Sequence, residues 1–311
     1  MHQTNTVRKR TLQELISPAP IGVFDSGVGG LSVLRAARAE LPQENFIYFA
    51  DSGYAPYGDK SDAYVTERSE RIGAWFVAQG AKAIVVACNT ATAIAVQTLR
   101  RNFAIPIVGV EPGLKPAIAA TRSGKVGVLA TAGTLASKRY ADLLARIQMD
   151  APQIDFIGQS GAAWVELVER GELTSAAAQD SIANVVAPLV ALGCDTLVLG
   201  CTHYPFLAPA IQIAAPNATI IDTAPAIARE LARRIAAQPS VTPGALLIAG
   251  SREPQRARRN AGLRRDAARQ FTRNGGRRID DRCVRRGDLH RRGETWLVRT
   301  AQVQRVAAKR H

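Results

Sequence analysis

Two of the four cysteines stand at equivalent places in the sequence, each directly after a short apolar run. Cys88 follows residues 83–87 and Cys201 follows residues 195–200, and both runs have the composition of buried strands. A helix start is predicted after each cysteine. Because a thiol at that place lies near the positive end of the helix dipole, its pKa is expected to fall below about 8.5. The sequence therefore offers two thiols able to exchange a proton near neutral pH.

A pair of opposed thiols suits the inversion of a carbon centre. Racemisation removes a proton from one face of the carbon and returns a proton to the other, which one base cannot easily do alone. One thiolate and one thiol would serve, with their roles exchanged in the reverse direction. His203 lies two residues from Cys201 and could tune its protonation. None of the seven lysines sits in a convincing Schiff-base setting, so we expect no cofactor. The spacing of Cys194, Cys201 and His203 fits no standard ligand pattern, so we expect no metal and interpret Cys194 as structural.

A glycine-rich segment follows the first predicted strand, with the sequence Asp25-Ser-Gly-Val-Gly-Gly30. Free N–H groups at a helix start attract carboxylates, and glycine allows a ligand to come close. The segment lacks the lysine of a phosphate-binding loop and the spacing of a dinucleotide-binding loop. Two interpretations stay open from these residues alone, an anion-binding loop and a plain strand-to-helix turn. Each cysteine, taken singly, could equally be an ordinary core residue.

Short β-branched runs alternate with apolar-periodic segments from residue 20 onward, which predicts parallel sheets with helices on both faces. The predicted strands are Pro20–Asp25, Asn45–Ala50, Lys82–Ala87, Pro106–Val110, Lys125–Ala130, Gln153–Ile157, Asp195–Gly200, Ala218–Asp222 and Ala245–Ala249. The predicted helices include Leu31–Leu41, Tyr64–Gln79, Thr134–Gln148, Ala176–Leu192 and Pro225–Ala237. Residues 21–26 align with 126–131, and 85–90 with 198–203, which indicates two similar α/β lobes.

The positive charge is concentrated at one end of the chain. Residues 250–311 carry 19 of the 40 Lys and Arg residues and 6 of the 26 Asp and Glu residues, so they hold nearly all of the net charge of +14. This Arg-rich tail has no sustained apolar periodicity and is expected to be disordered. Nucleic-acid binding through the tail is an alternative function, disfavoured because the tail lacks interleaved aromatic residues. Residues 1–19 are predicted to be a disordered leader.

Cysteine spacing and hydropathy point to an intracellular chain. The four cysteines are widely and irregularly spaced, which does not indicate a disulfide framework and favours a reducing cytoplasm. No apolar run reaches the roughly 18 residues that a membrane helix needs, so we expect no membrane partner.

Several multi-residue motifs, found in order over residues 20–249, resemble those of glutamate racemases in the aspartate/glutamate racemase family. They are Asp25-Ser-Gly-Val-Gly-Gly-Leu-Ser32, Ala50-Asp-Ser-Gly-Tyr-Ala-Pro-Tyr-Gly58, Ala87-Cys-Asn-Thr-Ala-Thr92 and Gly200-Cys-Thr-His-Tyr-Pro205. The resemblance implies interconversion of L- and D-glutamate, which supplies D-glutamate for peptidoglycan. An aspartate or hydantoin racemase and a non-catalytic glutamate-binding protein are the alternatives.

The resemblance also implies a role for individual residues. Cys88 would exchange the α-proton of D-glutamate with the help of Asp25. Cys201 would exchange the α-proton of L-glutamate with the help of His203. The residues implied to hold the substrate are Asp25, Ser26, Tyr57, Gly58, Asn89, Thr90, Thr131, Thr202 and His203. The site would lie between a first lobe of residues 20–112 plus 222–249 and a second lobe of residues 113–221. The partner is the small-molecule substrate, and the sequence leaves a homodimer open.

The similarity to the family fails near the C-terminus. Residues 245–251 only weakly resemble the strand with which family members usually close the first lobe, and Arg-rich sequence follows. A change of reading frame near residues 245–250 is the favoured explanation, because apolar periodicity and family pattern end together. A genuine basic extension is the alternative. Either explanation leaves the closing elements of the first lobe in question.

Overall fold

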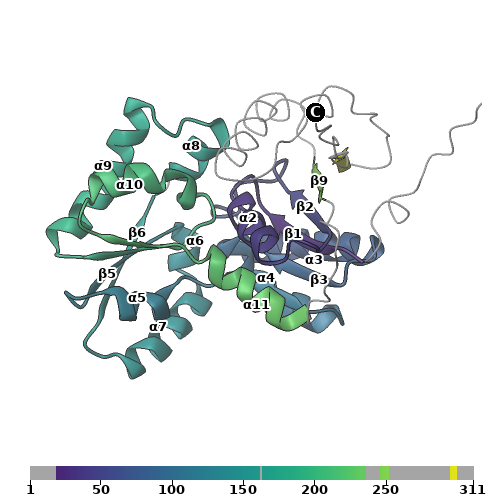
Figure 1. The fold of residues 1–311 in the computed structure, drawn as a ribbon, viewed down its shortest axis with the longest axis horizontal. Coiled ribbons are helices and arrows are strands. Elements are labelled where there is room, and N and C mark those ends of the chain that lie inside the picture. The colour runs from purple at the N-terminus through teal and green to yellow at the C-terminus, as the bar shows by residue number, and fades with distance from the viewer. Residues whose placement is uncertain (1–18, 162, 236–245, 252–294, 300–311) are drawn as a thin grey trace, which may run out of the picture.

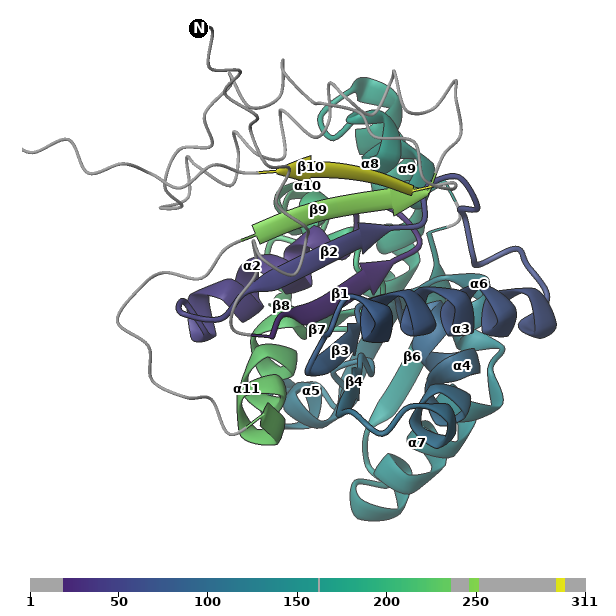
Figure 2. The same ribbon diagram turned by 90° about the vertical axis from the view of Figure 1, so that its right-hand side faces the viewer.

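The computed structural model describes residues 19–161, 163–235, 246–251 and 295–299. Within these ranges, strands and helices alternate along the chain and build two separate sheets (Figures 1 and 2). All neighbouring strands are parallel except the pair β9 and β10. Helices flank both sheets. The predicted α/β class with two parallel sheets is therefore confirmed.

The first sheet has the strand order β10-β9-β2-β1-β3-β4. Its strands are β1 (Ile21–Asp25), β2 (Phe46–Ala50), β3 (Ala83–Val86), β4 (Ile107–Gly109), β9 (Leu246–Ser251) and β10 (Thr295–Arg299). Every residue of β1, β2 and β3 is buried, which explains why these strands appear in the sequence as unbroken apolar runs. The order places the ends of β1 and β3, and hence Asp25 and Cys88, side by side.

Four helices cover the two faces of this sheet, and their bounds are α2 (Leu31–Glu40), α3 (Asp62–Ala78), α4 (Asn89–Asn102) and α11 (Ala224–Ile235). Helices α2 and α11 contribute to one apolar core, and α3 and α4 to another on the opposite face. Although α11 follows the second sheet in the chain, it packs beside α2 (Figure 1). The chain thus returns to the first sheet after forming the second.

The second sheet has the order β6-β5-β7-β8, formed by Lys125–Ala130 (β5), Asp155–Ser160 (β6), Thr196–Leu199 (β7) and Thr219–Ile221 (β8). Its flanking helices are α5 (Leu114–Ala120), α6 (Ala132–Leu135), α7 (Lys138–Asp150), α8 (Trp164–Arg170), α9 (Ala176–Ala191), the 3-10 helix Tyr204–Leu207 and α10 (Ala208–Ala214). Trp164 is fully buried and packs edge-on against Tyr204. This contact fixes α8 beside the segment that follows β7.

Four local predictions differ from the structure. The predicted helix Thr134–Gln148 is two helices, because Ser137 caps α7 by accepting from the Tyr140 N–H and so begins a new helix. Strand β6 lies further along the chain than predicted. The strand predicted to end at Ala249 continues to Ser251, and β10 lies inside the tail that was predicted to lack regular structure.

Some predictions fall on residues that the structure leaves out of its description. They concern the leader, residues 1–18, and most of the Arg-rich tail, residues 252–294 and 300–311. The division into lobes and the change of reading frame stay predictions. Among the described residues, none of the helices is both long enough and apolar enough to span a bilayer.

Candidate active site

The carboxyl ends of the strands in both sheets face one cavity, of about 650 Å³ including space open to solvent. Both Cys88 and Cys201 line it, and so does every predicted substrate-holding residue except Asp25. The lining residues are Ser26, Pro56, Tyr57, Gly58, Asp59, Cys88, Asn89, Thr90, Thr131, Ala132, Ser160, Val165, Glu166, Cys201, Thr202 and His203. Residues far apart in the sequence thus meet where open α/β sheets usually bind ligands.

Cys88 lies between β3 and α4, as predicted. It is the N-cap of α4, and its sulfur accepts a hydrogen bond from the Ala91 N–H at 3.4 Å. The thiol itself donates to Ser26 Oγ at 3.9 Å. Burial and the nearby carboxylate of Asp25 raise the pKa of Cys88 to about 12, while the Ala91 N–H opposes this rise. The expected net lowering of the pKa is therefore wrong for Cys88, because desolvation exceeds the effect of the helix start.

Cys201 lies just beyond β7 in different electrostatic surroundings. Its sulfur is 3.8 Å from Nδ1 of His203, and Nε2 of the same ring is 2.8 Å from Oε1 of Glu169. Burial lowers the pKa of His203, but hydrogen bonds and charge interactions with Cys201 and Glu169 raise it well above its usual value. The imidazole is therefore expected to be protonated at neutral pH and to offer a proton donor to each neighbour.

The carboxylate of Glu169 was missed in the sequence. Glu166, on the same helix α8, lines the cavity, but its side chain is mainly exposed and pairs with Arg170 at 3.5 Å. One turn further along the helix, Glu169 is only 17% exposed and reaches His203. A helical spacing of three residues could have suggested it. Without the position of α8, however, no feature of the sequence separates these two carboxylates.

Asp25 lies beneath the cavity and is fully buried. Its Oδ1 accepts from the Thr202 hydroxyl at 3.0 Å, and its Oδ2 accepts from the Gly27 N–H at 2.9 Å. Since Thr202 follows the second sheet and Asp25 ends the first, this hydrogen bond joins the two halves of the site. The same pair of segments is joined again by Ser32, whose hydroxyl donates to the Thr202 carbonyl at 3.1 Å.

The glycine-rich segment after β1 packs directly against the Cys201 side of the site. The N–H of Val28 donates to Oε1 of Glu169 at 2.7 Å. A Cβ atom at Gly29 would lie 2.4 Å from Nδ1 of His203, so only glycine allows this approach. The segment is therefore more than a plain strand-to-helix turn, because it contacts the residues that surround Cys201.

Hydroxyl groups join the two halves on the opposite side of the cavity. Oγ1 of Thr90, at the start of α4, is 3.1 Å from Oγ1 of Thr131, which caps α6. Beside them, a Cβ atom at Gly133 would lie 2.9 Å from the carbonyl oxygen of Gly58. The cavity thus lies between two seams where the sheets' loops touch, one beside Cys201 and one beside Thr131.

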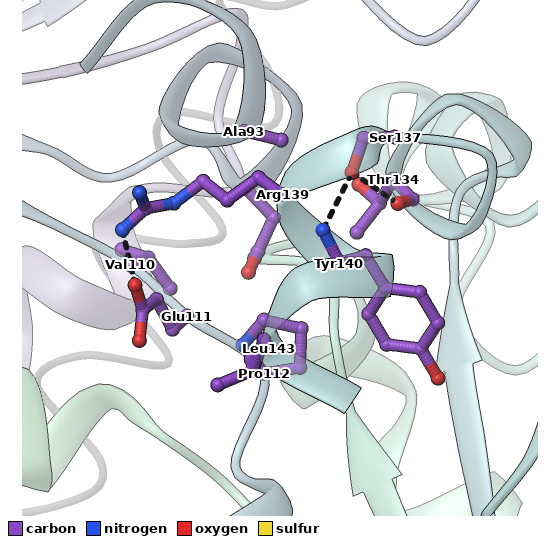
Figure 3. A pocket seen from close by; sticks show the side chains of 10 residues that line it. Ala93, Val110, Glu111, Pro112, Thr134, Ser137, Arg139, Tyr140 and Leu143 are labelled. Atoms are coloured by element: carbon purple, nitrogen blue, oxygen red, sulfur yellow. Dashed lines mark hydrogen bonds and ion pairs between the residues drawn. The ribbon is translucent and has the colours of Figure 1, made fainter. Parts of the chain in front are cut away.

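A second, smaller cavity adjoins the first at Asn89, which lines both. Glu111 lies in the segment between β4 and α5 and forms an ion pair with Arg139 of α7 (Figure 3). The pair joins the connection between the sheets to the second sheet's helices. Glu111 therefore lies in the connection between the sheets and does not line the cavity of the two cysteines.

These two sheets with strand-end cysteines across a shared cavity define a class of protein. The chain belongs to the Asp/Glu/hydantoin racemase family, whose sequence profile matches residues 31–231. A glutamate racemase of Methylococcus capsulatus is 52% identical over 224 residues, which are 72% of this chain and 82% of that protein. A glutamate racemase of Ralstonia pickettii is 54% identical over 220 residues, 70% of this chain and 77% of the relative.

Solved structures agree with these sequence comparisons. Escherichia coli glutamate racemase, in complex with L-glutamate and the activator UDP-MurNAc-Ala, has a TM-score of 0.72 at 33% identity and covers 80% of this chain and 96% of its own. Francisella tularensis glutamate racemase in complex with D-glutamate has a TM-score of 0.66 at 27% identity, covering 79% and 94%. The resemblance seen in the motifs is confirmed.

Proposed function

We propose that this protein interconverts L- and D-glutamate by transferring protons between the α-carbon and two cysteines. The observation that carries the proposal is the shared cavity, which brings a strand-end thiol from each sheet into one site. The relatives named above are glutamate racemases at just over half identity. The sequence motifs, the placement of the two thiols and the family membership therefore all support racemisation of glutamate.

In the direction from L- to D-glutamate, the Cys201 thiolate takes the α-proton, so that the C–H bond breaks and an S–H bond forms. The Cys88 thiol then gives its proton to the opposite face of the carbanion and is left as a thiolate. The protonated ring of His203 stabilises the Cys201 thiolate, with Glu169 holding the ring. The high pKa of Cys88 suits the proton donor in this direction.

Asp25 acts on Cys88 through its charge in this proposal. Both of its oxygens accept hydrogen bonds from Thr202 and Gly27, so it is fixed in place as a carboxylate. Its negative charge contributes to the raised pKa of Cys88. A thiolate formed at Cys88 is thereby made more basic, which favours removal of the α-proton from D-glutamate.

The substrate carboxylates are held without lysine or arginine side chains among the described lining residues. The starts of α4 and α6 supply N–H groups there, and Ser26, Thr90 and Thr131 supply hydroxyls. Helix starts favour anions, so we assign the carboxylates to these groups, together with Gly58, Asn89, Thr202 and His203, while Tyr57 forms the cavity wall beside them. The substrate ammonium and positioned N–H groups stabilise the carbanion.

The test is a circular-dichroism assay of purified protein with each glutamate enantiomer in D2O. We expect inversion accompanied by incorporation of deuterium at the α-carbon, and loss of inversion in Cys88→Ala and Cys201→Ala. Cys194→Ala is the matched control, because Cys194 is buried in the second sheet's core and does not line the cavity. Inversion with full retention of α-protium would contradict the two-thiol mechanism.

Aspartate and hydantoins are assayed beside glutamate, because the family includes racemases of all three. A visible chromophore that hydroxylamine removes would indicate a pyridoxal cofactor and contradict the proposal.

We further propose that the protein acts in the cytoplasm and supplies D-glutamate for peptidoglycan. We also propose that the protein forms a homodimer, which light scattering would test. The exposed apolar side chains Met149 and Ile213 are candidate contacts.

A further inference from the structure

One wall of the cavity is an irregular segment between β2 and α3. Residues 56–59 of this segment line the cavity, and residues 59–61 are exposed. Gly58 lies against Thr131 of the second sheet, since a Cβ atom at Gly58 would be 3.6 Å from Thr131 Cβ. The segment belongs to no helix or strand. Besides the backbone hydrogen bonds from the Tyr54 N–H to the Asp51 carbonyl and from the Lys60 N–H to the Tyr57 carbonyl, side-chain contacts on the first-sheet side contribute to its placement.

Asp51, directly after β2, supplies such contacts. Its Oδ2 accepts from the Tyr57 hydroxyl at 2.5 Å, and the side chain of Asp51 is fully buried. Arg68 of α3 donates to the same carboxylate twice, from Nε to Oδ2 at 3.0 Å and from Nη2 to Oδ1 at 2.8 Å. A two-pronged pair of this kind fixes geometry as well as charge.

Arg68 is itself held on its other face. Its guanidinium lies 3.5 Å from the centre of the Tyr54 ring, a cation–π contact within the same segment. The Arg68 side chain is only 12% exposed. Arg68 thus contacts the segment twice, once through Tyr54 and once through the carboxylate that binds Tyr57. Neither Arg68 nor Asp51 lines the cavity.

The Tyr57 hydroxyl has only one proton, and that proton is donated to Asp51. The ring is consequently fixed at the cavity wall, 1% exposed and close enough to Cys88 for its thiolate to contribute to the raised pKa of Tyr57, after burial and Asp51. Gly58 follows in the chain, so its backbone is placed by the same hydrogen bond. Loss of the anchor would free both lining residues.

We propose that Arg68 is a positioning residue of the racemase, acting through Asp51 to hold Tyr57 and Gly58 against the substrate. The inference rests on the proposed function. Arg68 touches neither the reacting carbon nor either thiol, so its effect is on substrate binding more than on proton transfer. A substitution should raise KM and change kcat little.

The test compares Arg68→Met, Tyr57→Phe and the double variant in steady-state racemisation of both enantiomers. We expect each single variant to raise KM about tenfold, the typical worth of one hydrogen bond to a charged group, with kcat within about twofold. The double variant should be no worse than the more affected single variant, because both substitutions break one chain of contacts. Arg71→Met is the matched control on α3, since Arg71 is 66% exposed and its ion-pair partner within the described part of the chain is Glu67.

An unchanged KM in Arg68→Met, or single effects that multiply in the double variant, would overturn the inference. If Arg68→Met fails to fold because Asp51 is left buried and unpaired, the variant Arg68→Met with Asp51→Asn removes that charge. The same rise in KM is then expected, and an unchanged KM again overturns the inference. An inactive wild-type chain would instead defeat the proposed function, which keeps the two failures distinct.

Discussion

The two thiols occupy the same place in their sheets but opposite electrostatic surroundings. Cys88 has a buried carboxylate nearby, and its pKa is raised to about 12. Cys201 has an imidazole 3.8 Å away, whose own pKa is raised by Cys201 and Glu169. A repeated backbone position therefore does not determine chemistry. The side chains around each sulfur determine which one is the better proton donor and which the better thiolate.

The largest expected effect distinguishes the two thiols by the glutamate enantiomer whose α-proton each one exchanges. Cys88→Ala should lose inversion by at least about a thousandfold, because the other face then has no proton donor. It should still exchange the α-proton of L-glutamate with solvent, through Cys201. Cys201→Ala should show the reverse preference, exchanging D-glutamate only.

Proton NMR in D2O measures both exchange reactions. Equal washout of the two enantiomers in either variant would contradict the assignment of one thiol to each face. Cys194→Ala should behave as the wild type in the same spectra.

An intermediate effect is expected at the carboxylate behind His203. Glu169→Gln removes a charge that raises the pKa of His203, so the imidazolium loses its proton at a lower pH. The alkaline limb of the kcat/KM profile should move to lower pH, with activity near pH 8 about tenfold lower, as for loss of one charged hydrogen bond. Glu166→Gln, on the same helix and mainly exposed, should leave the limb in place.

A pH-rate profile measured from pH 6 to 10 for the three proteins checks this prediction. A fall in activity at every pH, with no movement of the limb, would mean that Glu169 acts only as a structural contact.

The smallest expected effect concerns stability and tests the ionisation of the Cys88 thiol. With a pKa of about 12 in the folded protein and about 9 when unfolded, Cys88 keeps a proton that the unfolded chain releases between these values. The free energy of unfolding must therefore fall as pH rises through that window, by at most about 1.4 kcal/mol per pH unit. Cys88→Ser has no such ionisation and should lose less stability.

Urea unfolding at pH 8 and pH 10 gives the comparison. We expect the difference between the two pH values to be up to about 1.4 kcal/mol smaller in Cys88→Ser than in the wild type. A decline of the same size in both proteins would show that the Cys88 thiol is not held neutral by the fold.

The sequence was sufficient wherever function depends on one segment. Strand-end placement of Cys88 and Cys201 followed from the apolar runs before them, and the glycine-rich segment from its turn chemistry. It was insufficient where residues meet through tertiary packing. The contact of Glu169 with His203 depends on how α8 lies, and the raised pKa of Cys88 depends on burial. The roles of the site residues, like the lobe boundaries, stay predictions.

One oxygen atom belongs to both halves of the site. Oε1 of Glu169 accepts from the N–H of Val28, which follows the first sheet, and contacts Nε2 of His203, which follows the second. Withdrawing the Val28 N–H would leave this carboxylate more basic and tighten its hold on the imidazole proton. Proton affinity and the approach of the two sheets are therefore thermodynamically linked, so that titrating His203 changes how strongly the halves attract each other.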